Sequence, residues 1–225
     1  MRKLPTALLL AGALAFPTAA SASPDVTCFG GHRDFTLVGT ARADVLVGTP
    51  GKDVIYGAGG DDVIRGFGGD DILCGGPGGD RIEAGDGRDW IDGGDDAIHD
   101  RAEAGRPTSD RADIILGGPG DDNALGLDGD DYIHGGAGDD EIGGDRGSDL
   151  VIGGAGSDST YGGFYPAESG DDVLVGGPGD DYVAFPGAGD NRLYGGAGNG
   201  GDGTDTCGRL DWSLGCELAL FPDLP

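Results

Sequence analysis

The chain has 225 residues, and its 41 acidic side chains oppose 14 Lys and Arg, which gives a formal net charge of −27 at pH 7. Such a charge disfavours nucleic acid and anionic membranes as partners and favours cations. Low hydrophobicity combined with high net charge is also typical of disordered acidic linkers. The arrangement of the Asp residues therefore has to decide between disorder and a folded cation-binding protein.

The first segment, residues 1–22, has the pattern of a secretory signal peptide. A basic Met-Arg-Lys start precedes an apolar stretch from Leu4 to Phe16, and an A-x-A cleavage signal ends at Ala22. The apolar stretch is too short for a typical membrane span. We therefore predict a secreted, extracellular protein without membrane insertion.

The rest of the chain is long enough for about one domain. We predict an N-terminal cap over residues 23–38 and a repeat array over residues 39–203. A C-terminal cap over residues 204–225 is expected to cover the last open end of the core, because solenoid ends need capping.

A nine-residue period runs through the array. Each repeat has Gly ahead of an Asp, and a branched aliphatic follows two residues after that Asp, except at Ala124 and Thr160. Disorder would require no such phase relation, so the period predicts a folded protein. The Asp residues in phase are Asp44, Asp53, Asp62, Asp71, Asp80, Asp89, Asp113, Asp122, Asp131, Asp140, Asp149, Asp158, Asp172 and Asp181.

This pattern resembles the nonapeptide G-G-x-G-x-D-x-U-x, in which U is a large aliphatic residue, of the haemolysin-type calcium-binding or repeats-in-toxin (RTX) family. The resemblance implies an all-β protein, a parallel β-roll that is a right-handed β-solenoid. It also implies that Ca²⁺ ions lie between stacked turns, held by turn carbonyls and the Asp carboxylates of repeats two apart. The implied metal ligands are the fourteen Asp residues in phase, with Asp44, Asp62 and Asp80 on one edge and Asp53, Asp71 and Asp89 on the other. The second run divides in the same way into Asp113, Asp131, Asp149 and Asp122, Asp140, Asp158.

Each repeat is expected to form a six-residue turn and a three-residue strand. Alternate side chains of a strand face opposite sides, so the U residues form the core and the residues before them lie on outer faces or against end caps. Two repeats complete one coil, which stacks Leu46, Ile64 and Ile82 on one sheet and Ile55, Leu73 and Ile91 on the other.

Calcium is predicted to drive the folding of the array. One buried aliphatic side chain per nine residues offsets only part of the backbone entropy lost on folding, and stacked carboxylates repel each other. Oxygen ligands from carboxylates and carbonyls suit Ca²⁺, and its binding free energy then appears as folding free energy.

Four Cys in an exported chain favour disulfides, and four Cys allow three connectivities. We favour Cys28 with Cys74 and Cys207 with Cys216, so that each bridge staples one end of the array.

Two insertions interrupt the period, near residues 99–110 and 164–168. Insertions in solenoids usually become loops on one face, which is often the binding face, so neither needs to destroy the roll. The aromatic group of Tyr161, Phe164 and Tyr165 could contact a sugar or a protein, although folding back over the roll is favoured.

No catalytic motif accompanies the repeats: the three His residues form no H-E-x-x-H, and no nucleophile with a matching base is visible. We therefore expect no enzyme activity, and predict a secreted calcium-binding structural or binding module. A cell-surface or matrix polysaccharide is a candidate partner. The alternative is an extracellular β-solenoid that acts on polysaccharide or binds ligand through its insertion loops, using carboxylates outside the period such as Asp100, Glu103 and Glu168. An ice-binding roll is disfavoured because Thr residues are scattered.

Overall fold

The computed structural model describes residues 34–94, 111–163, 170–185, 191–195 and 206–209. These residues form seventeen short strands joined by tight turns, in agreement with an all-β fold. The strands are β1 (Leu37–Val38), β2 (Val45–Val47), β3 (Val54–Tyr56), β4 (Val63–Gly68), β5 (Ile72–Cys74), β6 (Arg81–Asp86), β7 (Trp90–Asp92), β8 (Ile114–Pro119), β9 (Asn123–Asp128), β10 (Tyr132–Ala137), β11 (Glu141–Arg146), β12 (Leu150–Ala155), β13 (Ser159–Tyr161), β14 (Val173–Val175), β15 (Tyr182–Phe185), β16 (Arg192–Tyr194) and β17 (Thr206–Arg209).

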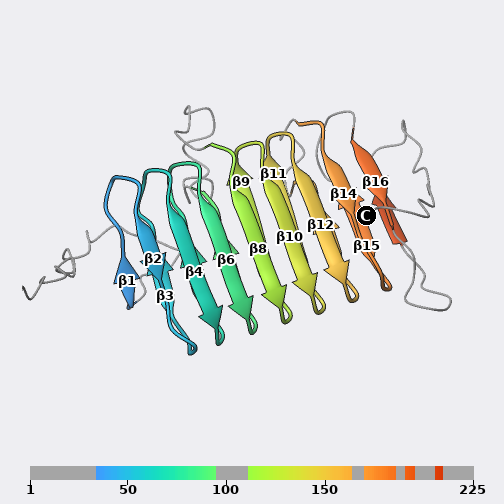
Figure 1. Cartoon of the computed structure of the whole chain (residues 1–225). Helices are drawn as coiled ribbons and strands as arrows, with labels where there is room; N and C mark the ends of the chain where they lie inside the picture. The colour runs from blue at the N-terminus through green and yellow to red at the C-terminus, as the bar shows by residue number, and fades with distance from the viewer. Residues whose placement is uncertain (1–33, 95–110, 164–169, 186–190, 196–205, 210–225) are drawn as a thin grey trace, which may run out of the picture.

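The strands form two parallel sheets that face each other (Figure 1). The odd sheet contains the nine odd-numbered strands in sequence order, and the even sheet contains the eight even-numbered strands. The chain therefore changes sheet after every strand, and residues one coil apart pair in parallel, as Leu46 does with Ile64 and Ile64 with Ile82. The predicted parallel β-solenoid with two repeats per coil is confirmed, whereas its handedness stays a prediction.

The core lies between the two sheets and consists of the U residues. The largest of them are completely buried, and Ala124 and Thr160 occupy the same core position at 2% and 0% exposure. This core was predicted correctly because alternation along a three-residue strand leaves only one inward position. Its buried aliphatic members are Ile55, Ile64, Leu73, Ile82, Ile91, Ile115, Ile133, Ile142, Val151, Leu174 and Val183.

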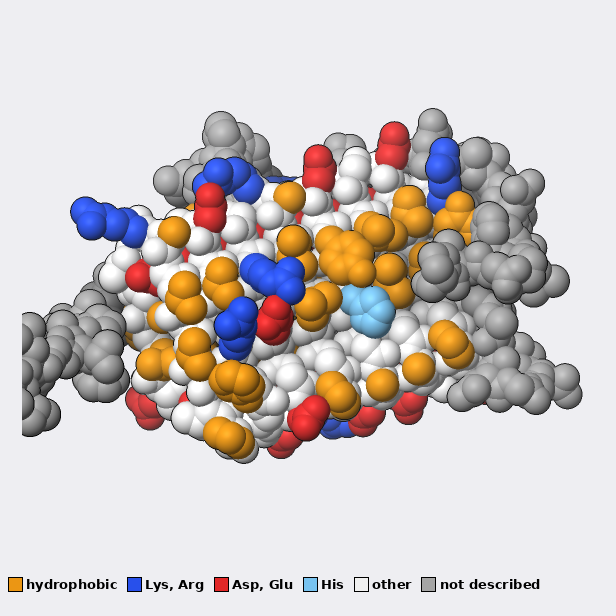
Figure 2. Space-filling model, in the orientation of Figure 1, with side chains coloured by type: hydrophobic (Ala, Val, Ile, Leu, Met, Phe, Trp, Pro, Cys, Tyr) orange, Lys and Arg blue, Asp and Glu red, His pale blue; other side chains and the backbone are white. Residues whose placement is uncertain are grey.

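The residues before U lie on the outer faces, as expected. Val45 is 67% exposed and Trp90 is 45% exposed. Ile72 differs, at 8% exposure, because it packs with Cys74 in a small cluster that also contacts Phe35 and Tyr56. Apolar side chains also gather along the outer face of the even sheet (Figure 2).

The two insertions do not interrupt the solenoid. Across the first, Ile82 pairs with Ile115 in the even sheet and Ile91 pairs with Ala124 in the odd sheet. Across the second, β12 pairs with β14 and β13 with β15. The predicted continuity of the roll is therefore confirmed, while the insertion residues 99–110 and 164–168 lie outside the described residues.

Several strands are longer than the three residues expected. Seven strands in the middle of the roll span six residues because their first turn residues also pair between coils. Gly118 pairs with Gly136, and Gly136 pairs with Gly154, in the same ladder as the core residues before them. Stacked turns of equal length thus continue the sheet hydrogen bonding beyond the core segment.

The ends of the array are described only in part. Cys74 is buried and is not a free thiol, but its expected partner Cys28 lies outside the described residues, as does Cys216. The disulfide pairings, the signal peptide over residues 1–22 and the cap boundaries therefore stay predictions. Within the described ranges, no helix is long and apolar enough to cross a membrane.

Candidate metal centre

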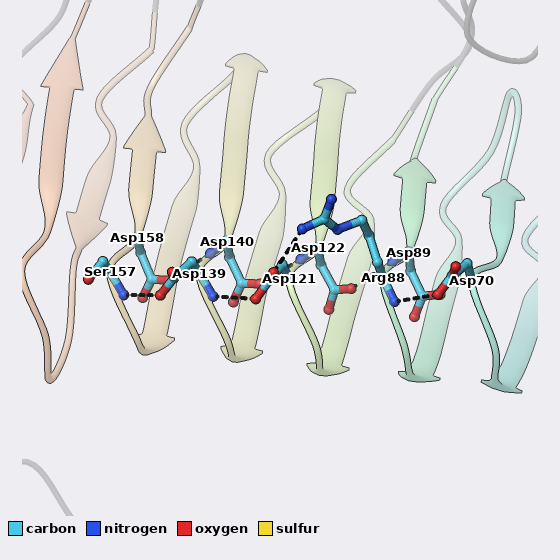
Figure 3. A network of polar contacts seen from close by, with 9 residues as sticks. All are labelled: Asp70, Arg88, Asp89, Asp121, Asp122, Asp139, Asp140, Ser157 and Asp158. Atoms are coloured by element: carbon cyan, nitrogen blue, oxygen red, sulfur yellow. Dashed lines mark hydrogen bonds and ion pairs between the residues drawn. The ribbon is translucent and has the colours of Figure 1, made fainter.

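The fourteen Asp residues in phase form two columns, one on each edge of the roll. Each stands directly before a strand, so that the column before the even strands contains Asp44, Asp62, Asp80, Asp113, Asp131, Asp149 and Asp172, and the column before the odd strands contains Asp53, Asp71, Asp89, Asp122, Asp140, Asp158 and Asp181. We call these residues the inner Asp ladder. Figure 3 shows part of the second column, from Asp89 to Asp158.

One carboxylate oxygen of each stacked pair is held by the backbone. The N–H of an inner Asp donates to Oδ1 of the inner Asp one coil later, as Asp122 N–H does to Asp140 Oδ1 at 2.8 Å. The contact also spans the first insertion, where Asp89 N–H donates to Asp122 Oδ1 at 2.8 Å. The sequence shows two separate runs of Asp residues, and in the structure these runs form continuous columns across the insertion. A hydrogen bond to Oδ1 fixes the direction of the carboxylate.

The second oxygen, Oδ2, is buried and has no hydrogen-bond partner in seven inner Asp residues, namely Asp62, Asp71, Asp89, Asp122, Asp140, Asp149 and Asp158. An unpaired buried carboxylate oxygen is costly, so such atoms in a native fold call for an ion or another group. Their repetition from Asp62 to Asp158 indicates a repeated site.

Six of these seven Oδ2 atoms face a space that glycine leaves open. A Cβ atom placed on Gly57 would lie 2.3 Å from Asp62 Oδ2 and 2.4 Å from the carbonyl oxygen of Gly75. A Cβ on Gly135 would likewise lie 2.3 Å from Asp140 Oδ2. A carboxylate oxygen and a carbonyl oxygen of the next coil therefore converge on the position of the missing side chain.

The glycine five residues before the inner Asp is replaced once in the described turns. Ala84 stands five residues before Asp89, where the other described turns have Gly. Ala84 is fully buried, and Asp89 Oδ2 still has no hydrogen-bond partner. We infer that the space beside Asp89 is narrower than its neighbours.

These oxygens fit a hard divalent cation. Ca²⁺ takes six to eight oxygen ligands, including carboxylates and backbone carbonyls. In the described part of the chain, no group of three or more His, Cys, Asp or Glu side chains converges. A calcium ion between two turns would therefore have to draw many of its ligands from turn carbonyls, which the tight glycine turns bring close together.

Burial raises the pKa of the inner Asp residues. Desolvation is the largest cause, neighbouring Asp charges add to it, and the backbone N–H at Oδ1 opposes it. The pKa of Asp122 rises to about 7 and that of Asp149 to about 8. Desolvation also raises the pKa to about 6 in Asp62, Asp71, Asp89, Asp140, Asp158 and Asp172. A bound cation would relieve this cost by balancing the charge.

The even-edge column contains one further acceptor that the sequence analysis did not assign. Asp172 N–H donates to Oδ1 of Asn191 at 2.8 Å, so Asn191 continues the column in place of Asp. Leu193 follows two residues later and packs against the core. This Asn-x-Leu spacing is the signal that could have found Asn191.

A second, outer Asp ladder was not predicted from the sequence; it is formed by the residues directly before the inner Asp. Here the hydrogen bonds run the other way: Asp139 N–H donates to Asp121 Oδ1 at 3.1 Å, and Ser157 N–H donates to Asp139 Oδ1 at 2.8 Å (Figure 3). The outer residues are exposed. The doubled Asp-Asp in many repeats was the available signal.

The aromatic group near the second insertion is only partly described. Tyr161 packs edge-on against Tyr182, with ring centroids 6.1 Å apart, while Phe164 and Tyr165 lie outside the described residues. The carboxylates Asp100, Glu103 and Glu168 lie outside them as well, so their suggested roles stay untested.

The comparison with protein families agrees with this geometry. The RTX calcium-binding nonapeptide repeat, a family described as four copies of the repeat, matches residues 38–73, 47–82, 75–97, 108–142, 138–164 and 167–184. This comparison finds the repeat domain and detects no catalytic domain. No curated protein matches the chain.

Proposed function

The chain belongs to the RTX calcium-binding nonapeptide repeat family and binds Ca²⁺, and from this premise we propose that it is a secreted structural and binding module whose β-roll folds on calcium. Secretion is supported by the signal-peptide pattern of residues 1–22 and by the typical use of RTX repeats in secreted bacterial proteins. Calcium available outside the cell would then complete the fold after export.

The observation that carries this proposal is the row of buried, unpaired Oδ2 atoms. We assign calcium ligation to the inner Asp ladder, together with the turn carbonyls of the next coil. The ion would supply positive charge to oxygens that otherwise face each other without a donor. Without it, folding has to bury these charges uncompensated, which opposes the metal-free fold.

A calcium titration followed by circular dichroism tests the coupling of binding and folding. We expect little β-structure in excess chelator and a cooperative gain on adding calcium. A full β-spectrum in chelator would contradict calcium-driven folding.

Neighbouring carboxylates offer a matched pair of variants. Asp140→Asn removes an inner charge, and Asp139→Asn removes an outer charge one residue away while keeping the Oδ1 that accepts the N–H of Ser157. Asp140→Asn should raise the calcium concentration at the folding midpoint by about tenfold, in line with a loss of roughly 1.4 kcal/mol. Asp139→Asn should change it less than twofold. Equal shifts would remove the assignment to the inner ladder.

For the partner, we propose a cell-surface or matrix polysaccharide that contacts the edge carrying the two insertions. The support is topological: one insertion follows β7 and the other follows β13, so both leave the odd sheet at the same edge of the roll. Insertions gathered on one face of a solenoid commonly form its binding surface. The calcium-loaded protein should bind a polysaccharide panel, and deletion of residues 164–168 should weaken that binding without changing the calcium midpoint. Binding that is unaffected by the deletion would contradict this assignment.

A further inference from the structure

The first described turn on each edge supplies hydrogen-bond donors to an inner Oδ2 atom, whereas seven later inner Asp residues have an Oδ2 without such a donor. Thr40 donates both its backbone N–H, at 2.6 Å, and its hydroxyl, at 2.7 Å, to Asp44 Oδ2. Thr49 does the same to Asp53 Oδ2, at 2.6 and 3.0 Å. These two oxygens are therefore satisfied by the protein itself.

The hydroxyl of Thr49 also contacts the backbone of Gly51. The N–H of Gly51 donates to its oxygen at 3.3 Å, and its proton can reach Asp53 Oδ2 at 3.0 Å or the carbonyl oxygen of Gly51 at 3.2 Å. The backbone N–H of Thr49 therefore provides the fixed donor to Asp53 Oδ2, and the hydroxyl lies within reach of the same atom.

The cause lies in the backbone four residues before the inner Asp. A β-branched residue strongly disfavours positive φ, and neither Thr40 nor Thr49 adopts it. The later turns all have positive φ at this position wherever it is described, namely at Ala58 (84°), Phe67 (80°), Gly76 (92°), Gly85 (115°), Gly118 (120°), Leu127 (78°), Gly136 (129°), Asp145 (71°), Gly154 (121°) and Gly177 (122°).

This difference in φ reverses the direction in which the N–H of this residue points. In the positive-φ turns the N–H points to the next coil, as Gly154 N–H donates to the carbonyl oxygen of Gly176 at 2.9 Å. In the threonine turns the same N–H points at the carboxylate of its own repeat. A hydroxyl could rotate to offer a lone pair to a cation, but a backbone N–H cannot.

We propose that the first space on each edge, beside Asp44 and beside Asp53, binds no calcium, and that Thr40 and Thr49 form a metal-free N-terminal cap of the calcium array. This inference rests on the proposed calcium ligation by the later inner Asp residues. It narrows that assignment, because Asp44 and Asp53 belong to the same period yet are removed from the set of ligands. The cap still joins the array, since Asp44 N–H donates to Asp62 Oδ1 at 2.8 Å and Asp53 N–H to Asp71 Oδ1 at 2.8 Å.

The chain offers a close template for converting a threonine turn into a regular one. Thr49→Gly would give Gly-Gly-Pro-Gly-Lys-Asp over residues 48–53, and residues 117–122 already read Gly-Gly-Pro-Gly-Asp-Asp. Gly118 precedes Pro119 with a φ of 120°, so glycine before proline is compatible with the regular turn. Thr49→Val is the matched control: it loses the hydroxyl but keeps the β-branched side chain and therefore the N–H at the carboxylate.

Calcium counting by native mass spectrometry on the full-length, calcium-loaded protein tests the proposal. We expect Thr40→Gly/Thr49→Gly to bind two ions more than the wild type, one per edge, and Thr40→Val/Thr49→Val to bind the same number as the wild type. The circular dichroism of each loaded variant checks that it is folded. Equal counts in the wild type and the glycine variant would overturn the proposal.

A second measurement does not depend on the glycine variant. Asp44→Asn/Asp53→Asn should leave the ion count of the wild type unchanged, whereas Asp71→Asn should lower it. A lower count in Asp44→Asn/Asp53→Asn would overturn the cap. If the wild type binds calcium but the variants give other counts than these, only the cap is refuted. If the wild type binds no calcium, the proposed ligation and the cap are refuted together.

Discussion

The inner and outer Asp ladders have the same side chain at adjacent positions, yet their environments are opposite. Asp140 is 2% exposed and belongs to a column whose hydrogen bonds run from each N–H to the next coil. Asp139 is exposed, and its column runs back to the previous coil. We therefore attribute the proposed calcium ligation to burial and to an oxygen left without a donor, and not to acidity alone.

The largest test of this contrast is pH, because it acts on the whole inner ladder at once. Burial raises the pKa to about 6 in six inner Asp residues, to about 7 in Asp122 and to about 8 in Asp149. The metal-free fold then binds protons more tightly than the unfolded chain, so its stability should increase as the pH falls from about 8 to about 4.

The sign reverses when calcium is bound, since calcium requires deprotonated carboxylates and protons displace it. Circular dichroism of the calcium-stripped protein and urea unfolding midpoints of the calcium-loaded protein, each at pH 8, 6 and 4.5, measure the two pH dependences. A metal-free protein that loses structure on acidification would contradict the burial of uncompensated charge in the inner ladder.

A single inner charge should show the same reversal on a smaller scale. Asp149→Asn removes the carboxylate with the most raised pKa while keeping an Oδ1 acceptor for Asp131 N–H, which lies at 2.9 Å. We expect it to stabilise the metal-free fold by about 1–3 kcal/mol, because it removes a buried charge, and to destabilise the calcium-loaded fold.

The matched outer variant is Asp130→Asn, whose Oδ1 accepts the N–H of Ser148 at 2.9 Å on the surface. It should change the stability of neither the metal-free nor the calcium-loaded fold appreciably. Circular dichroism of the calcium-stripped proteins and chemical denaturation of the calcium-loaded proteins give the two comparisons, and opposite signs for Asp149→Asn are the decisive result.

A smaller effect is expected where the turn already departs from the glycine pattern. Ala84→Gly removes a Cβ from the space beside Asp89 and should lower the calcium concentration needed at that turn a few-fold. Glycine in a strand costs about 0.5–1 kcal/mol in backbone entropy, so the variant should also weaken the metal-free fold. Ala137→Gly, at an exposed position of β10, carries the same backbone cost without opening a space. Calcium titrations of both variants separate the two effects, and equal affinities would show that Ala84 does not narrow the site.

Much of this architecture could be predicted because the nine-residue period places one side chain inward and one Asp at each turn. Ile55 and Leu73 stack in the core for that reason, and Asp62 and Asp80 share a column. The pairing of Ile82 with Ile115 was harder to predict, since it joins coils across a long insertion and depends on three-dimensional stacking.

The direction of the hydrogen bonds in each turn could not be predicted from the sequence pattern. Asp44 and Asp62 occupy the same position in the period, but their turns differ four residues earlier. Thr40 directs its N–H to the carboxylate of Asp44, whereas Ala58 has the positive φ of the regular turn. A residue four positions from the carboxylate thus decides whether its second oxygen is satisfied. Such an effect depends on backbone dihedrals, which the spacing of Asp and Gly does not reveal.

The smallest predicted effect concerns Arg88, which takes the outer position where half of the repeats have Asp. Its guanidinium lies 2.8 Å from Asp121 Oδ2 across the first insertion, and its N–H donates to Asp70 Oδ1 at 3.2 Å (Figure 3). The two side chains are 63% and 49% exposed, so water and salt screen the pair. Arg88→Gln should lower the melting temperature of the calcium-loaded protein slightly at low ionic strength, and the difference should vanish near 1 M salt. Its calcium midpoint should equal that of the wild type, because the outer ladder is not expected to hold the ion. A marked change in calcium affinity would mean that the outer ladder contributes to the site after all, and would break the contrast between the two ladders.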